Sequence, residues 1–223
     1  MRGSQIRGAV LTLAMLACTH SEAFAASPTA TSDAPAAAAA TLSAPGTKPT
    51  FVPANFDVPR SVEAAGFKIL PLGPDLVDVD FAAYMSSIEH LQKTFSRSAD
   101  WPHEGITHAD AMKDMETEQA RFSARKSFAY AVLTPDGRRE RGSVYVSPSP
   151  VPGYDAVVRM WVTKAEHDAG FDAELYQWVG RWMKKAWPFA KVAYPGRSID
   201  WKVWDRMLQV QRSGQNASVV DKQ

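Results

Sequence analysis

Between Phe67 and Leu208 the chain alternates short β-rich runs with longer stretches whose apolar residues recur at helical spacing. Proline and glycine separate the runs, as they do at Pro71 and again at Pro135 and Gly137. A hydrophobic period near two predicts a strand, and a period near 3.6 predicts a helix. The resulting order is strand, helix, helix, strand, strand, strand, helix, strand, helix. We therefore expect a single α+β domain.

The predicted elements have recognisable boundaries. Thr107, with Asp110 three residues later, forms a variant of the capping box and predicts a helix start. The turn residues around Asp136 predict a hairpin between two strands. The expected strands are 67–70, 128–134, 142–146, 156–163 and 192–194, and the expected helices are 76–95, 107–122, 171–186 and 199–208.

The residues before this domain have the layout of an export signal followed by a spacer. Arg2 and Arg7 precede the apolar run 9–17, which is about half the roughly 20 residues that a membrane-spanning helix needs. The Ala, Pro, Ser and Thr that follow bury too little surface to order a chain. We predict a signal peptide over 1–25, a disordered linker over 26–60, the domain over 61–208 and a polar tail over 209–223.

Two cleavage sites compete within the signal. Residues 15–18 resemble a bacterial lipobox, in which Cys18 would carry a lipid, whereas Ala23-Phe24-Ala25 is an ordinary small-x-small site. The first predicts a membrane-anchored lipoprotein and the second a periplasmic protein. Cys18 is the sole cysteine, which excludes an intramolecular disulfide.

The net charge and the spacing of the histidines bear on two kinds of binding partner, nucleic acids and metal ions. The chain has 25 Lys and Arg against 24 Asp and Glu, so it lacks the basic excess of a nucleic-acid-binding protein. His103 and His108 are five residues apart, rather than the four that place two metal ligands on one helix face. We expect neither a nucleic-acid partner nor a metal site.

Several local sequences, taken with the element order, carry a family resemblance. They are Phe128–Leu133, Gly142–Val146 with Pro148, Val158–Val162, Trp187-Pro188-Phe189 and Tyr194–Arg197. The chain over about 67–208 resembles the GNAT superfamily of acyl-CoA-dependent N-acyltransferases. The resemblance implies a mixed, mostly antiparallel central sheet flanked by helices, a V-shaped cleft, and acetyl-CoA as the cofactor of an active member. The usual C-terminal hairpin is missing from the pattern, because a polar tail follows Leu208.

The resemblance also points to a cofactor loop. Active members hold the pyrophosphate on a [Gln/Arg]-x-x-Gly-x-[Gly/Ala] turn, where backbone N–H groups and a helix N-terminus meet the phosphates. The matching stretch is 167–172, in which Gly170 fits and Asp172 adds a like charge. Arg197 offers another route to phosphate. The acyl-CoA-binding residues implied are Val162, Thr163, Lys164, His167 and Gly170.

An active member also needs a general base and a general acid. Glu118, Tyr145 and the neighbours of Arg159 in the fourth strand are the candidates for the base, and Tyr194 is the candidate for the acid. Each has a structural alternative, which is a solvated helix face for Glu118 and strand packing for Tyr194. Trp201 and Trp204 could form a ligand wall or belong to the core.

Three functions remain open at this stage. The first is an exported, non-catalytic binding or scaffolding domain of the bacterial envelope, because acyl-CoA is a cytosolic cofactor. The second is an N-acetyltransferase that uses acetyl-CoA through a divergent loop. The third is a structural lipoprotein without a small ligand.

Overall fold

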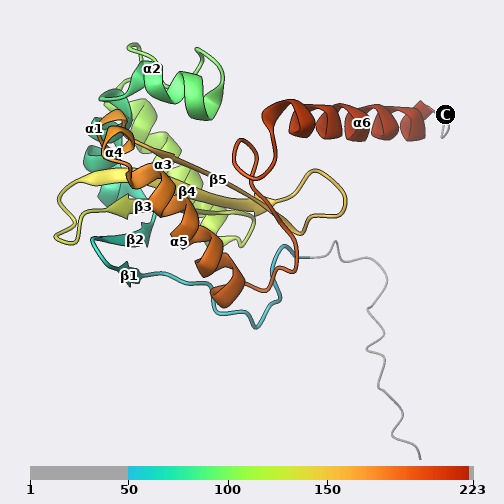
Figure 1. The fold of residues 1–223 in the computed structure, drawn as a ribbon, viewed down its shortest axis with the longest axis horizontal. Helices are drawn as coiled ribbons and strands as arrows, with labels where there is room; N and C mark the ends of the chain where they lie inside the picture. The colour runs from blue at the N-terminus through green and yellow to red at the C-terminus, as the bar shows by residue number, and fades with distance from the viewer. Residues whose placement is uncertain (1–49, 221–223) are drawn as a thin grey trace, which may run out of the picture. The chain divides into compact units, whose positions relative to one another are not determined.

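The computed structural model describes residues 50–220, with the backbone alone for 215–220. These residues belong to one unit, Thr47–Gln223. Its centre is a six-stranded sheet in the order β1-β2-β3-β4-β5-β6, and all neighbours are antiparallel except the parallel pair β5 and β6 (Figure 1). The predicted mixed, mostly antiparallel sheet flanked by helices is confirmed. The strands are β1 (Val62–Ala64), β2 (Phe67–Pro71), β3 (Phe128–Leu133), β4 (Glu140–Pro148), β5 (Ala156–Val162) and β6 (Val192–Ala193).

Helices cover both faces of the sheet. α5 lies on one face, and α1 and α3 lie on the other (Figure 1). The helical elements are η1 (Pro74–Leu76), α1 (Val77–Met85), α2 (Ile88–Leu91), the π-helical turn η2 (Gln92–Ser96), α3 (His108–Ser123), α4 (Lys164–Asp168), α5 (Phe171–Ala186) and α6 (Trp201–Val220).

Strand β3 shows how the sequence determines this layering. All six of its residues are buried, because the strand is central and covered on both faces. Its large residues Phe128 and Tyr130 pack in the cluster that includes α5. Its small residues Ala129 and Ala131 pack in the cluster that includes α1 and α3. Burying each large side chain contributes about 1.5–3 kcal/mol.

The helix predicted over 76–95 is broken in the structure. α1 ends at Met85, and the chain re-enters helix at Ile88 after Ser87, whose backbone is not helical (φ −142°, ψ 28°). The buried Ser87 hydroxyl accepts a hydrogen bond from the Lys164 backbone N–H at 2.9 Å. This long-range contact coincides with the break in the helix. The start predicted at Thr107 is confirmed, since Thr107 and Asp110 form a reciprocal capping box.

The predicted end of the linker at residue 60 is wrong. Val52 and Val58 are buried in the core, and the Phe51 ring stacks on Phe128 at 5.7 Å. The Tyr130 hydroxyl donates to the Pro59 carbonyl at 2.8 Å. Phe51, Val52 and Val58 therefore anchor the chain before β1. The rest of the predicted linker, the signal peptide and Cys18 lie outside the described residues.

The final helix is longer than predicted. It was expected to end at Leu208, with a polar tail beyond, but α6 continues to Val220. Glutamine and arginine, which follow Leu208, favour helix on intrinsic propensity although they bury little surface. Within residues 50–220, no helix combines the length and apolar character that crossing a membrane requires.

Candidate functional site

Strands β5 and β6 separate soon after they meet. They pair only through Ala156 with Val192 and Val157 with Ala193, after which β6 ends. The outer edge of β5 beyond Val157 instead faces a cavity of about 240 Å³. This cleft is lined by α2 and η2, by β5, by the start of α5 and by the segment between β6 and α6. The structure therefore contains the cleft between separated strands that the resemblance predicted.

Two ion pairs connect segments around the cleft. The Arg197 guanidinium, which follows β6, makes a two-pronged contact with the Asp172 carboxylate in the first turn of α5. Arg97, which follows η2, binds Asp205 of α6 through bonds of 3.0 and 2.7 Å. Both arginines therefore have a carboxylate as counter-ion.

Gly196 lets the segment after β6 approach α6 closely. Its φ is 74°, and a Cβ there would lie 2.4 Å from the Trp201 indole. A side chain would therefore clash as well as strain the backbone. Trp201 lines the cleft, whereas Trp204 is buried in the core. Of the two predicted positions, Trp201 therefore has the one at a ligand cleft and Trp204 has the one in the core.

Arg159 lies at the floor of the cleft without a counter-ion. Its Nη2 donates to the Phe95 carbonyl, and its guanidinium stacks 4.3 Å from the Phe95 ring centroid. Its Nε is buried and has no hydrogen-bond partner, and no carboxylate of the described residues forms an ion pair with it. Burial, together with nearby Arg97, lowers its pKa, but a guanidinium still keeps its proton.

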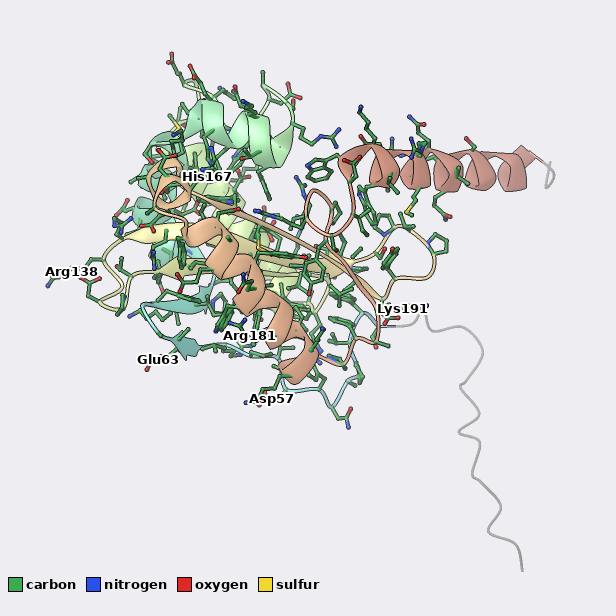
Figure 2. All side chains as sticks on the ribbon, in the orientation of Figure 1. Asp57, Glu63, Arg138, His167, Arg181 and Lys191 are labelled. Carbon is green, nitrogen blue, oxygen red and sulfur yellow. The ribbon has the colours of Figure 1, made fainter. Side chains whose placement is uncertain are left out.

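Two histidines contribute to the same cleft. The rings of His90 in α2 and His167 in α4 lie 4.9 Å apart between centroids, and Figure 2 shows His167 near the start of α5. Burial lowers the pKa of His90, and the neighbouring His167 and Lys164 lower it further. His90 therefore favours the neutral form at neutral pH.

An aromatic pocket of about 280 Å³ adjoins the cleft. Phe95 and Arg159 line both cavities. The Phe95 ring lies 5.6 Å from Tyr145 and 5.8 Å from Trp101. We call this cavity the aromatic pocket. Its lining consists of Phe95, Trp101, Tyr145, Ser147, Val157 and Arg159.

Trp101 and Tyr145 also line an acidic pocket of about 240 Å³, whose carboxylates are Asp80, Asp114 and Glu118. Asp80 is only 4% exposed, and burial raises its pKa to about 7. Burial and the adjacent Asp80 raise the pKa of Glu140, which is fully buried. Ser143 donates to Glu140 Oε1 at 2.6 Å, while Oε2 lacks a donor. A proton retained between the two carboxyl groups removes one of the buried charges.

The residues predicted to bind acyl-CoA have different positions. Val162 and His167 line the cleft. The Thr163 hydroxyl instead caps α4 by accepting from the Glu166 N–H at 3.3 Å. Lys164 Nζ bonds to Asp168 at 2.7 Å. Gly170 joins α4 to α5 at a φ of 84°, a conformation that favours glycine.

The predicted catalytic residues do not form one site. Glu118 and Tyr145 both line the acidic pocket. Burial raises the pKa of Glu118, which pairs with Arg121 at 2.9 Å. Burial and Asp80 raise the pKa of Tyr145, whose hydroxyl accepts from Trp161 Nε1 at 3.3 Å.

Tyr194 belongs to the core cluster that includes α5. Its ring packs edge-on against Tyr176 at 5.6 Å, and burial raises its pKa to about 12. Tyr145 packs against the cluster on the other face of the sheet. The structure therefore separates the predicted acid from the predicted bases.

The most informative site residues were not identified from the sequence. Arg159 interrupts the otherwise apolar run 156–162, and a charge inside a buried strand is a usable signal. Asp80 shares the helical stripe of Val77 and Tyr84, which is another such signal. Glu140 has no comparable signal, because it begins its strand.

No protein-family model and no curated protein sequence matches the chain. Solved structures are similar to it in fold. The ribosomal-protein-S5-alanine acetyltransferase of Vibrio fischeri has a TM-score of 0.47 and 15% identity, over 58% of this chain and 69% of that one. A protein from Bordetella pertussis assigned to the GNAT family has a TM-score of 0.43 and 17% identity, over 57% and 74%.

A third similar structure is the aminoglycoside 6'-N-acetyltransferase of Acinetobacter baumannii, with a TM-score of 0.37 and 15% identity, over 66% of this chain and 89% of that one. The element order and sheet of the chain are those that the resemblance in the sequence implied. This architecture is consistent with the GNAT fold. Similarity at these identities concerns the GNAT-like fold alone and not the chemistry of its cleft.

Proposed function

We propose that the chain is an exported binding domain of the bacterial envelope that holds a small anionic ligand in the cleft and transfers no acyl group. The observation that carries the proposal is Arg159, a half-buried cation that lines the cleft and has no counter-ion among the described residues. Taking a charge out of water is costly unless the charge is paired. An anionic ligand supplies the missing partner.

The neighbours of Arg159 strengthen this argument. Arg97 and Arg197 each bind a carboxylate in two-pronged geometry, so their charges are balanced within the protein. Arg159 donates instead to a neutral carbonyl and stacks on an aromatic ring. These contacts hold the guanidinium in place without neutralising it. A carboxylate or phosphate that reaches it forms charge-assisted hydrogen bonds.

The start of α5 argues against acyl-CoA as the ligand. A helix N-terminus attracts phosphate through its free N–H groups and its dipole. Here the Asp172 carboxylate already lies in the first turn of α5, and Arg197 binds it. A pyrophosphate would meet a like charge and compete with an existing ion pair.

Calorimetric titration of the full chain with sodium acetate, inorganic phosphate and coenzyme A tests the proposal. We expect saturable binding of acetate or phosphate, weakened at least tenfold by Arg159→Gln, because hydrogen bonds to charged groups contribute about 1.5–3 kcal/mol. Arg181→Gln is the matched control, since Arg181 is exposed on α5 (Figure 2). If none of the three ligands binds, the proposal is wrong.

One observation favours a second function, N-acetyl transfer from acetyl-CoA. Within residues 50–220, no strand pairs with the outer edge of β5 beyond Val157, and this edge faces the cleft, so its backbone groups can bond to an amide-bearing chain. This function predicts that acetyl-CoA binds more tightly than phosphate and releases free thiol when an amine is present. Tight binding without thiol release would contradict it.

Export and lipid attachment form a separate part of the proposal. They are supported by the apolar run 9–17 and by Cys18 at its end. Labelling cells with radioactive palmitate compares the wild-type chain with Cys18→Ser. Label on the wild type alone supports a lipid anchor. Secretion without any label supports release after Ala25, and retention in the cytoplasm contradicts export.

A further inference from the structure

We propose that the ligand bound by Arg159 is an aromatic carboxylate whose ring lies in the aromatic pocket. The inference rests on the proposed anion site at Arg159 and adds the chemical class of the ligand. Its basis is the position of Arg159 between a polar cleft and a pocket walled by aromatic rings.

The sheet register places the charge and the rings together. Tyr145 of β4 lies directly opposite Arg159 of β5, so their side chains are neighbours on one face of the sheet. Phe95 contacts both of them, through its ring with Tyr145 and through stacking with Arg159. A ligand whose carboxylate meets the guanidinium therefore has its body beside these rings.

The walls of the pocket favour a flat apolar body. Phe95, Trp101 and Tyr145 supply rings, Val157 supplies an apolar surface and Ser147 supplies one hydroxyl. Aromatic rings prefer partners that pack offset or edge-on, which adds about 0.5–1.5 kcal/mol beyond burial. The volume of about 280 Å³ is ample, because an apolar cavity of about 150 Å³ holds benzene.

The charge balance favours a carboxylate as the anionic group. Arg159 is the cation that lines the aromatic pocket, and one guanidinium neutralises the single negative charge of a carboxylate. The planar fork of a guanidinium also matches the two oxygens of a carboxylate. Because Arg159 is already held by the Phe95 carbonyl and ring, binding immobilises little further side-chain freedom.

Calorimetry with four probes tests the inference on the full chain. Phenylacetate carries both groups, acetate lacks the ring, cyclohexylacetate replaces the flat ring with a puckered one, and 2-phenylethanol lacks the charge. We expect phenylacetate to bind at least tenfold more tightly than any of the other three. Equal affinity for phenylacetate and cyclohexylacetate would overturn the aromatic preference.

A variant that fills the pocket locates the ring. Ser147 lines the aromatic pocket, so Ser147→Phe is expected to lower phenylacetate affinity to the level of acetate and to leave acetate affinity unchanged. Ser147→Ala adds no bulk and is expected to keep wild-type affinity. If Ser147→Phe leaves phenylacetate binding intact, the ring lies elsewhere and the inference is wrong.

The outcomes separate this inference from the proposed function. If acetate binds and depends on Arg159 but phenylacetate binds no more tightly, the aromatic inference fails while the anion site stands. If no anion binds and Arg159→Gln changes nothing, both fail. Strong binding of 2-phenylethanol that is insensitive to Arg159→Gln would show an apolar pocket unconnected with the anion site, which also overturns the inference.

Discussion

Two pockets share Trp101 and Tyr145 in their lining, and each contains a charged group with little contact with water. Asp80 is buried in the acidic pocket and Arg159 is half-buried in the aromatic pocket, and the two groups differ in how their charge can be neutralised. On the acidic side, burial raises the pKa of Asp80 to about 7 and raises that of Glu140, so this pair can hold a proton. Arg159, in contrast, cannot become neutral, because a guanidinium keeps its proton in proteins. A carboxyl pair can therefore lose one of its charges by holding a proton, whereas a half-buried arginine keeps its charge and is stabilised by an anionic partner.

This difference explains why the two sides suggest different roles. The acidic pair is a self-contained buried element, with Ser143 donating to one oxygen. Around the cleft, Arg97 and Arg197 each form an ion pair with a carboxylate, whereas Arg159 forms none with the described residues. We infer function from Arg159, a half-buried cation that lacks a carboxylate partner among the described residues.

The largest expected effect comes from removing Trp161, which supports both Trp101 and Tyr145. Trp161 is 2% exposed, packs against Trp101 and donates to the Tyr145 hydroxyl. Trp161→Ala is expected to lower the free energy of unfolding by about 3–5 kcal/mol, through lost burial and a cavity. Urea denaturation at equilibrium measures the loss. Trp161→Phe keeps a ring and should lower the free energy of unfolding clearly less. If both variants lower it equally, the stabilisation comes from the hydrogen bond to Tyr145 rather than from packing.

The next largest effect is a dependence of stability on pH, which arises from Asp80 in the acidic pocket. Because the folded-state pKa of Asp80 is above its ordinary value, the folded protein binds more protons than the unfolded chain between about pH 4 and 7. Stability is therefore greatest at the low end of this window and falls as pH rises through it. We expect a loss on the order of 2 kcal/mol between pH 5 and 8, measured by urea denaturation.

Two variants identify the source of this pH dependence. Glu140→Gln supplies an amide that can donate to Asp80, so the Asp80 pKa falls and the loss of stability with pH becomes smaller. Glu63→Gln removes an exposed carboxylate and should keep the wild-type slope (Figure 2). If Glu140→Gln also keeps that slope, the buried pair is not the titrating element.

The smallest effect concerns the ion pair beside Arg159. Asp172→Asn removes a negative charge from the cleft and releases Arg197, so acetate affinity should rise about threefold to tenfold. Because both partners keep some contact with water, stability should fall by only about 1 kcal/mol. Calorimetry on this variant and on Glu63→Gln separates the local effect from net charge. Weaker acetate binding to Asp172→Asn would show that the ion pair positions the site.

The sequence predicted the sheet better than it predicted the site, for physical reasons. Strands and α5 are defined by local apolar periods, and Phe128–Leu133 reads as buried from its own composition. The break at Ser87 depends on a hydrogen bond to Lys164, 77 residues away. A contact of that kind leaves no periodic signal near either residue.

The site shows the same limit more strongly. Glu118 and Tyr145 were selected as separate candidates, and the fold places both on the acidic pocket. Arg159 becomes informative only when its surroundings show that no carboxylate reaches it. Charge balance is a property of three-dimensional neighbours, and the sequence carries only a hint of it in the apolar context of that strand.

The measurement that tests the central claim most directly is urea denaturation of the wild type and Arg159→Met, with and without acetate. Acetate should stabilise the wild type by about 2.7 kcal/mol at a hundredfold excess over Kd and leave the variant unchanged. Without acetate, the variant should match the wild type within about 1 kcal/mol, because an apolar side chain replaces an unbalanced charge. Equal stabilisation of both proteins by acetate, or a loss of several kcal/mol in the variant without acetate, would contradict the claim that Arg159 awaits an anion.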